Sequence, residues 1–242
     1  VVQNHVLQLL CLVAMEPPAL ASAKSTRDEK VKVLSSVEVP MDEPFPSWCV
    51  RGQYTEGQGV KGYVSEEGVA PDSVTETYVA LRLRIDNWRW AGVPFLLRSG
   101  KCLKERVTEI AVQFKQPPTH FFRDLGIPMP EANTLAFRIQ PDEAISLRFN
   151  AKPPGMEMQI APVNMDFTYG EAFKDALPEA YERLILDALR GDSTLFMRSD
   201  EIDYAWQIAT TIADTWKDAP PPELYRPGTW GPASADKLFG SC

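Results

Sequence analysis

The middle of the chain alternates apolar and polar residues with a period of two. From residue 75 to residue 85 every second side chain can face a core, which is typical of a β-strand with one buried face. The same alternation returns in four later segments that are separated by turn residues: 107–114, 134–139, 144–150 and 165–169. This succession of strands predicts a large, mostly antiparallel β-sheet.

Helical patterns flank these strands on their N-terminal side. Residues 1–15 are apolar almost all round, which predicts a helix that is buried on most sides. Thr26 and Glu29 form a capping box that opens a second helix over residues 27–35, in which Val31 and Leu34 can face inward. Residues 37–73 are rich in glycine, proline, serine and acidic residues, and this composition predicts a long surface excursion with one short strand.

Two more helices are predicted on the C-terminal side of the strands. Pro178 starts a helix over residues 179–189, and Ser199 caps a helix over residues 200–216 whose first turn carries two acidic residues. Strands with helices at both ends of the chain predict an α+β fold, a large antiparallel sheet packed with helices. We find no linker that clearly divides the chain, so we expect one domain over residues 1–242.

Composition narrows the class of protein. The chain has 242 residues, of which 44% are hydrophobic and 24% charged, so it can bury a sizeable core. Its formal charge of -8 provides no basic field for a nucleic-acid backbone. The longest apolar stretch is too short to cross a bilayer, so we expect neither a nucleic-acid nor a membrane partner.

The four cysteines are far apart and form no C-x-x-C pair. Cys11 lies within an apolar helical run, which fits reduced thiols in a cytoplasmic protein better than a disulfide scaffold. Only two histidines accompany them, and these are isolated too, so the sequence predicts no metal site.

One glycine-rich segment matches the G-x-G-x-x-G pattern of dinucleotide-binding proteins. It covers residues 57–62, with glycine at 57, 59 and 62. The motif binds a pyrophosphate only between a buried strand and a helix N-terminus. Residues 51–56 do not have the pattern of a buried strand, and the residues after Gly62 run into Pro71 instead of an amphipathic helix. We therefore interpret the segment as a glycine-rich loop.

Two features can carry chemistry, and each has a plainer explanation. Residues 100–106 place several cations in a turn after an apolar strand, where they can grip a phosphate or sugar hydroxyls, although a solvated basic turn is favoured by these residues alone. His5 can act as a general base near pH 7, although a lone histidine in an apolar helix is more often a core residue. We assign no role to His120.

Six segments together carry a resemblance to one family. They are 2–17, which contains Gln3-Asn4-His5, then 27–34, 90–95, 97–101, 138–143, and 180–185 with 198–201. In this order, and through the closing Gly231-Pro232-Ala233, they resemble the glucose-6-phosphate dehydrogenases over nearly the whole chain. The resemblance implies oxidation of glucose 6-phosphate at C1 to 6-phosphogluconolactone with NADP as hydride acceptor.

The resemblance also implies roles for individual residues. His5 matches the family's general base, which takes the C1 hydroxyl proton as the hydride leaves. Lys101, Arg106 and Gln140 match residues that contact the substrate. Some members hold a second, structural NADP, and Arg98 and Arg138 match positions used there. Val107, Ala111 and Trp230 stand where that second site has basic residues, which argues against it in this chain.

Other parts of the family pattern lie outside this sequence. In the family, two parts precede the Q-N-H helix: the coenzyme-binding domain, which makes most of the NADP contacts, and the substrate-phosphate site. We therefore expect this chain to be an inactive fragment by itself. The family associates through its sheet, which implies a homodimer or homotetramer. The alternative is a stand-alone module that binds a sugar phosphate or forms oligomers without catalysis.

Overall fold

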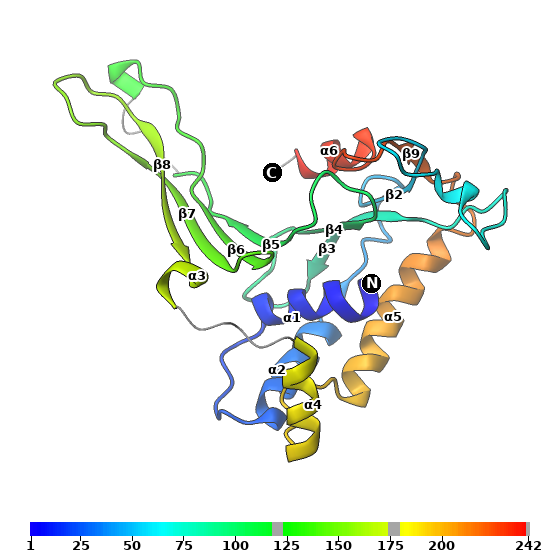
Figure 1. Cartoon of the computed structure of the whole chain (residues 1–242). Coiled ribbons are helices and arrows are strands. Elements are labelled where there is room, and N and C mark those ends of the chain that lie inside the picture. Colours follow the sequence, from blue (N-terminus) through cyan, green and yellow to red (C-terminus); the bar gives the residue numbers. More distant parts are fainter. Residues whose placement is uncertain (118–122, 174–179, 241–242) are drawn as a thin grey trace. The chain divides into compact units, whose positions relative to one another are not determined.

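The computed structural model describes residues 1–117, 123–173 and 180–240. The chain divides into two compact units, one of Val1–Glu105 with Glu179–Cys242 and the other of Arg106–Pro178. Each unit contains its own sheet, and helices accompany mostly antiparallel strands (Figure 1). The α+β fold class is therefore confirmed, with the strands divided between two sheets. A single domain over residues 1–242 stays a prediction.

The sheet of the first unit is built around β3 (Tyr78–Ile85). It pairs antiparallel with β2 (Cys49–Tyr54), β4 (Phe95–Gly100) and β1 (Val37–Glu38). A short strand from far along the chain, β9 (Glu223–Tyr225), extends the sheet by pairing in parallel with β2. The sequence pattern did not predict β9, because a three-residue strand is too short to show a period.

The main core lies between this sheet and three helices, α1 (Leu7–Ala14), α2 (Ala23–Ser35) and α5 (Ser199–Thr215). The predicted inward row of β3, from Val79 to Ile85, is buried in this core. On the other side of the sheet, Tyr78 and Ala80 pack with α6 (Ala233–Phe239) in a second cluster. The first half of β3 is therefore buried on both faces, and the prediction of a single buried face is wrong there.

The first helix departs from its prediction in two ways. A π-helical turn, Val2–Val6, precedes α1, and its wide ring is closed by the Val6 N–H, which donates to the Val1 carbonyl at 3.3 Å. Burial is confined to one stripe of α1, namely Leu7, Leu10, Cys11 and Ala14, while Leu12 is 51% exposed. The expectation of burial on most sides is therefore wrong.

The starts of two other helices also differ from the predictions. α2 begins four residues before the predicted start, because the Ser22 hydroxyl accepts the Ser25 N–H at 3.2 Å and caps the helix there. The N-cap of α5 is Arg198 and not Ser199, and the Arg198 N–H donates to the Glu201 carboxylate at 3.0 Å. α4 (Ala180–Arg190) is confirmed, although Pro178 lies outside the described residues.

The region predicted as a surface excursion contains the buried strand β2, so that prediction is wrong for residues 49–54. All six residues of β2 are buried, including Arg51 and Gln53. Arg51 donates to the Pro220 carbonyl at 2.7 Å, and the Gln53 amide donates to the Ser73 and Thr75 carbonyls at 2.9 and 3.0 Å. These distant carbonyls lower the cost of burying the Arg51 Nη2 group and the Gln53 amide, while the Arg51 Nε remains buried without a partner.

The second unit is a four-stranded antiparallel meander. Its strands follow in sequence order: β5 (Thr108–Gln113), β6 (Thr134–Gln140), β7 (Ala144–Ala151) and β8 (Ala161–Thr168). The first three agree with the predicted segments, whereas β8 begins four residues before its predicted start and Tyr169 opens the short helix α3 (Tyr169–Ala172). Two 3-10 turns, Tyr63–Ser65 and Arg123–Leu125, complete the described elements. None of the helices in the described residues is long and apolar enough to cross a membrane.

Candidate functional site

His5 lies in the π-helical turn that begins the first unit. This turn contacts β4 and α5, so it is held at the edge of the main core, while the His5 side chain itself is exposed. Its imidazole makes no hydrogen bond within the described part of the chain, so His5 is not the satisfied core histidine that an apolar helix would suggest. π-helical turns occur often at functional sites, because they redirect a side chain.

Lys101 directly follows β4, in a loop whose backbone is fixed. Its N–H donates to the Thr77 carbonyl at 2.9 Å, and its carbonyl accepts the Tyr225 hydroxyl at 2.7 Å. Further along the loop, the Lys104 N–H donates to the Thr229 carbonyl at 2.9 Å. The Lys101 side chain is exposed, so a free ammonium group extends from an anchored backbone.

Arg106 and Gln140 lie together at one end of the sheet in the second unit. Gln140 is the last residue of β6 and pairs with Thr108, the first residue of β5, while Arg106 precedes that strand by two residues. Both side chains are exposed. A guanidinium and an amide at one strand end offer several donors and one acceptor, which suits a polyhydroxylated ligand.

The structure therefore groups the four predicted residues into two pairs. His5 and Lys101 belong to contacting elements of the first unit, because the turn of His5 touches β4 and Lys101 follows that strand. Arg106 and Gln140 belong to the second unit. Each pair stays a predicted part of a sugar site.

Two residues that local sequence patterns did not indicate anchor the Lys101 loop. Tyr225 and Thr229 come from the segment around β9, more than 120 residues further along the chain. Burial raises the pKa of the Tyr225 hydroxyl above its usual range, so this group stays a neutral donor to the Lys101 carbonyl. Nothing in the local sequence signals this contact, because the two segments are more than 120 residues apart and meet only in the folded chain, where Leu103 also forms a parallel bridge with Thr229.

The two arginines considered for a second NADP site already have partners of other kinds. The Arg98 guanidinium lies over the rings of Trp230 and Phe239, at 4.6 and 5.2 Å from the ring centroids. Arg138 forms an ion pair with Glu109 on the neighbouring strand at 3.9 Å, and it belongs to the other unit. Because the Arg98 guanidinium already stacks on two aromatic rings, it is not free to stack on an adenine ring.

The glycine-rich segment at residues 57–62 forms a tight two-residue turn. Gly57 and Val60 exchange two backbone hydrogen bonds of 3.1 and 2.9 Å, and the residues between them, Gln58 and Gly59, both have positive φ values of 50° and 78°. A buried strand does precede it, contrary to our expectation, but only the 3-10 turn Tyr63–Ser65 follows. Without a helix N-terminus the segment does not fit a pyrophosphate.

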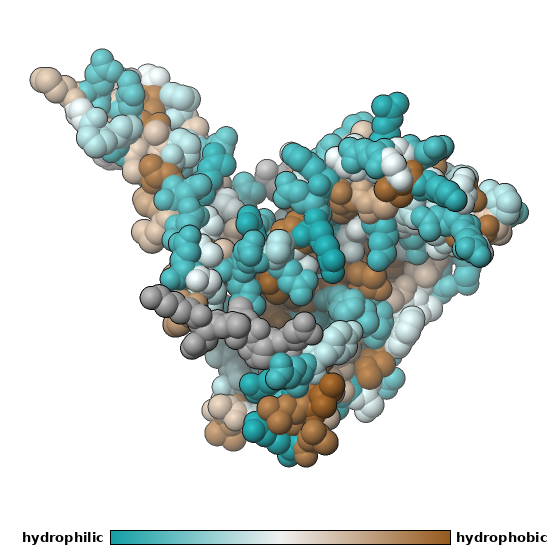
Figure 2. Space-filling view, in the orientation of Figure 1, coloured by the Kyte–Doolittle hydropathy of each residue, from teal (hydrophilic) through white to brown (hydrophobic). Residues whose placement is uncertain are grey.

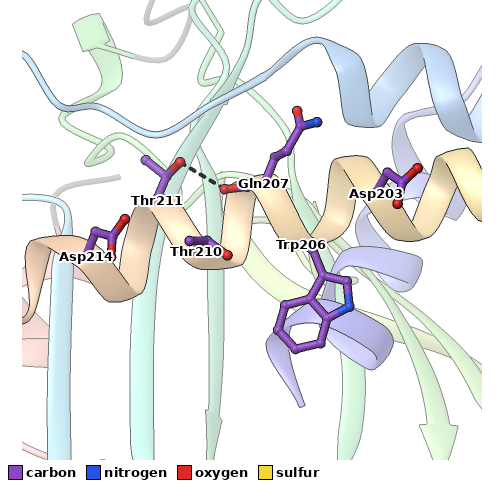
Figure 3. Close-up of a pocket in the computed structure, with 6 residues that line it drawn as sticks. All are labelled: Asp203, Trp206, Gln207, Thr210, Thr211 and Asp214. Atoms are coloured by element: carbon purple, nitrogen blue, oxygen red, sulfur yellow. Dashed lines mark hydrogen bonds between the residues drawn. The ribbon is translucent and has the colours of Figure 1, made fainter.

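One shallow pocket of the first unit lies on α5, and none of the predicted residues lines it. Figure 3 shows its lining, which comes from this helix alone: Asp203, Trp206, Gln207, Thr210, Thr211 and Asp214. The Thr211 hydroxyl is occupied by a 2.8 Å hydrogen bond to the Gln207 carbonyl. A pocket with a single helix as its wall encloses nothing, so we assign it no chemistry. Within the described ranges no group of three or more metal-ligating side chains occurs either.

Residues 1–241 match the protein family described as glucose-6-phosphate dehydrogenase, C-terminal domain. The chain is 48% identical over 241 residues to glucose-6-phosphate 1-dehydrogenase of Aggregatibacter actinomycetemcomitans, a match that covers 98% of the chain and 48% of that relative. It is 46% identical over 243 residues to glucose-6-phosphate 1-dehydrogenase 2 of Mycobacterium tuberculosis strain H37Rv, covering 99% and 47%. The chain thus spans about half the length of the curated relatives it matches.

Solved structures show the same relationship. Glucose-6-phosphate 1-dehydrogenase from Mycobacterium avium is 40% identical with a TM-score of 0.81, and the match covers 98% of the chain and 48% of that protein. A glucose-6-phosphate dehydrogenase in complex with its substrate glucose-6-phosphate is 38% identical with a TM-score of 0.89, covering 100% of the chain and 49% of that protein.

Proposed function

The chain belongs to the glucose-6-phosphate dehydrogenase family, as a match to its C-terminal domain, and from this premise we propose that it forms the sugar-binding part of such an enzyme. The full-length enzyme would oxidise glucose 6-phosphate at C1 to 6-phosphogluconolactone, with NADP as hydride acceptor. The observation that carries this proposal is the match over residues 1–241, supported by a similar structure of a glucose-6-phosphate dehydrogenase in complex with glucose-6-phosphate.

His5 is proposed as the general base. Oxidation of an alcohol requires that the hydroxyl lose its proton as the hydride leaves, and a neutral imidazole accepts a proton near pH 7. The His5 side chain is exposed in the π-helical turn, while contacts of this turn with β4 and α5 fix its backbone. Fixed placement matters because a base must lie within hydrogen-bond reach of the proton it removes.

Lys101, Arg106 and Gln140 are proposed to bind and orient the sugar phosphate. Lys101 offers a compact, fully charged donor, and Arg106 and Gln140 add a guanidinium and an amide. Several fixed donors and acceptors are needed because a sugar must present one particular carbon to the reacting groups. Neither Lys101 nor Arg106 forms an ion pair with another described residue, so both positive charges are free to meet a ligand, and the neutral amide of Gln140 is exposed beside Arg106.

The coenzyme is proposed to bind mainly outside this chain. The segment at residues 57–62 lacks the following helix that a pyrophosphate site needs, and Arg98 is stacked on aromatic rings. The described residues therefore do not fit NADP, and the steps that we assign to this chain are those at the sugar. The half of the relatives' length that this chain does not cover provides the room for a coenzyme-binding domain.

Self-association is proposed through the sheet of the second unit. Pairing places Phe149 opposite Val163, Leu147 opposite Met165 and Ile145 opposite Phe167, so these apolar side chains share one face of the sheet. The three residues on β8 are exposed. An exposed apolar face of this kind marks a protein interface, which supports a homodimer or homotetramer. We also propose that the enzyme is cytoplasmic and that its thiols are reduced.

The proposal is tested by replacing His5 in the full-length polypeptide that contains this chain. His5→Asn is expected to lower turnover of glucose 6-phosphate by about 10²-fold or more, the scale for loss of a general base, while substrate binding changes little. NADPH absorbance measures turnover, and Leu12→Ala, at an exposed position of α1, is the control. A His5→Asn enzyme with normal turnover would contradict the role of His5. Binding of glucose 6-phosphate without turnover in the unmodified protein would favour the non-catalytic module.

A further inference from the structure

The apolar side of α4 is uncovered in the described structure. Tyr181, Ile185 and Leu189 are 78%, 62% and 82% exposed, and Leu186 beside them is also exposed. Because these three residues are spaced by four, they form a single stripe along the helix. Figure 2 shows the hydrophobic colour gathered over α4 at the lower end of the view.

The opposite side of α4 carries a buried acid. The Asp187 side chain is buried, and its carboxylate accepts two hydrogen bonds from the Arg183 guanidinium, both of 3.0 Å. A helix on the surface of a soluble protein normally has the reverse arrangement, with apolar residues inward and charges outward. Packing within the described part of this chain therefore does not cover the apolar stripe, and the stripe needs a partner.

The charges around the stripe and the length of the relatives indicate that partner. Glu182, Arg183 and Arg190 border the stripe with both signs of charge, which gives no one-sided field for nucleic acid or an anionic membrane. The chain covers only 48% of the relative from Aggregatibacter, so that relative has about as much polypeptide again outside the match, and we take the full-length protein to be built in the same way. We infer that the α4 stripe packs against an apolar surface in that other half of the same polypeptide.

Site-specific photo-crosslinking of the full-length protein tests this inference. A benzoylphenylalanine at position 189 is expected to crosslink to peptides outside the 242 residues of this chain, as identified by mass spectrometry. The same group at position 224 is the matched control, because Leu224 is similarly exposed in the first unit but lies on β9. Mixing copies with and without ¹⁵N distinguishes a crosslink within one chain from a crosslink between two.

Three results would overturn the inference: a crosslink from position 189 to a second copy, a crosslink to residues 106–178, or the same pattern as position 224. Ile185→Asp combined with Leu189→Asp gives an independent readout. In the full-length protein this pair should increase hydrogen exchange in the half outside this chain, whereas Leu224→Asp should not. An unchanged exchange rate there would also contradict the inference. Neither measurement depends on turnover, so the proposed activity can fail while this inference holds.

Discussion

Lys101 combines a fixed backbone with a free side chain. Two hydrogen bonds, to Thr77 and from Tyr225, hold its main chain, and no ion pair within the described residues occupies its ammonium group. Anchoring lowers the entropy lost when the side chain meets a ligand, because only its rotamers remain to be fixed. Lys104, three residues later, is exposed in the same loop and has the same charge. A comparison of substitutions at the two lysines therefore distinguishes a specific contact with the ligand from a general electrostatic attraction by the loop.

Replacing these lysines one at a time in the full-length protein tests the role of Lys101. Lys101→Ala is expected to weaken binding of glucose 6-phosphate by roughly 1 to 3 kcal/mol, the scale for loss of a hydrogen bond to a charged group. Lys104→Ala should change binding much less, as judged from KM and from direct titration calorimetry. Equal losses in both variants would mean that the loop acts only through its overall charge.

Asp28 should make the stability of the protein depend on pH. Lys24 at 2.8 Å and Arg198 at 2.6 Å bind its carboxylate and lower its pKa from the usual 3.8 to about 2. Because the pKa is lower in the folded state, this contribution is present above the unfolded value and is lost as the pH falls through the folded value. The pairing with Arg198 joins α2 to the start of α5.

We therefore expect Asp28→Asn to be less stable than the unmodified protein near neutral pH, and the difference to disappear as the pH falls from about 4 to about 2. Thermal unfolding midpoints measured at a series of pH values check this. Asp72→Asn, in an exposed loop, is the control and should follow the unmodified protein throughout. A difference that stays constant over this pH range would show that the loss comes from packing and not from the charge.

At the scale of elements, alternation of apolar and polar residues predicted the strands of the second unit well. β5, β6 and β7 fall within two residues of their predicted bounds, although none of their residues is fully buried. β2 was missed because Arg51, Gly52 and Gln53 break the pattern of a buried strand. The Arg51 Nη2 group and the Gln53 amide donate to carbonyls 20 to 169 residues away, and such partners leave no local signal.

The candidate site was still less predictable from local pattern. The composition around His5 favoured a core residue, and the turn that contains Lys101 and Arg106 favoured a solvated basic turn. Resemblance over six segments, and not spacing, singled out these residues. The structure adds what neither could provide, namely that the His5 turn is π-helical and that Tyr225 holds the Lys101 loop. The second feature depends on a contact between residues 124 positions apart, which no local pattern can show.

Gly100 joins β4 to the Lys101 loop through a close contact that leaves no room for a side chain. It pairs with Tyr78 on β3, and a Cβ at this position would lie 2.6 Å from the Tyr78 ring and 3.2 Å from Leu103. Gly100→Ala is expected to lower the free energy of unfolding by about 1 to 3 kcal/mol, the usual cost of overpacking. Urea titration measures this.

The matched control for this change is Gly170→Ala. No atom lies within 4 Å of a Cβ placed there, and Gly170 is in the helix α3, where alanine is favoured over glycine. Gly170→Ala should therefore leave stability unchanged or raise it slightly. Equal destabilisation by both substitutions would indicate that the loss of glycine flexibility matters, and not the contact between Gly100 and Tyr78.

At the scale of the molecule, the first unit is assembled from both ends of the chain. Val1–Glu105 and Glu179–Cys242 form it together, and Arg106–Pro178 is inserted between them as a second unit. The predicted sugar residues follow this division, since Lys101 lies four residues before the boundary and Arg106 is the first residue after it. The loop that joins the units is thus also the segment that carries two of the proposed substrate contacts.

The last prediction concerns residues 1–242 alone: they should fold and associate, but they should not oxidise glucose 6-phosphate. Folding is expected because two buried clusters provide a core, and association because the sheet of the second unit has an exposed apolar face. Turnover is not expected, because we propose that the coenzyme binds mainly outside this chain, and a hydride moves only to an acceptor held close to C1. Light scattering gives the mass, and NADPH absorbance with both substrates in excess gives the activity. Met165→Asp, on the exposed face of β8, should lower the mass without unfolding the chain. Turnover that disappears in His5→Asn would contradict this prediction, because the chain would then contain a coenzyme site of its own.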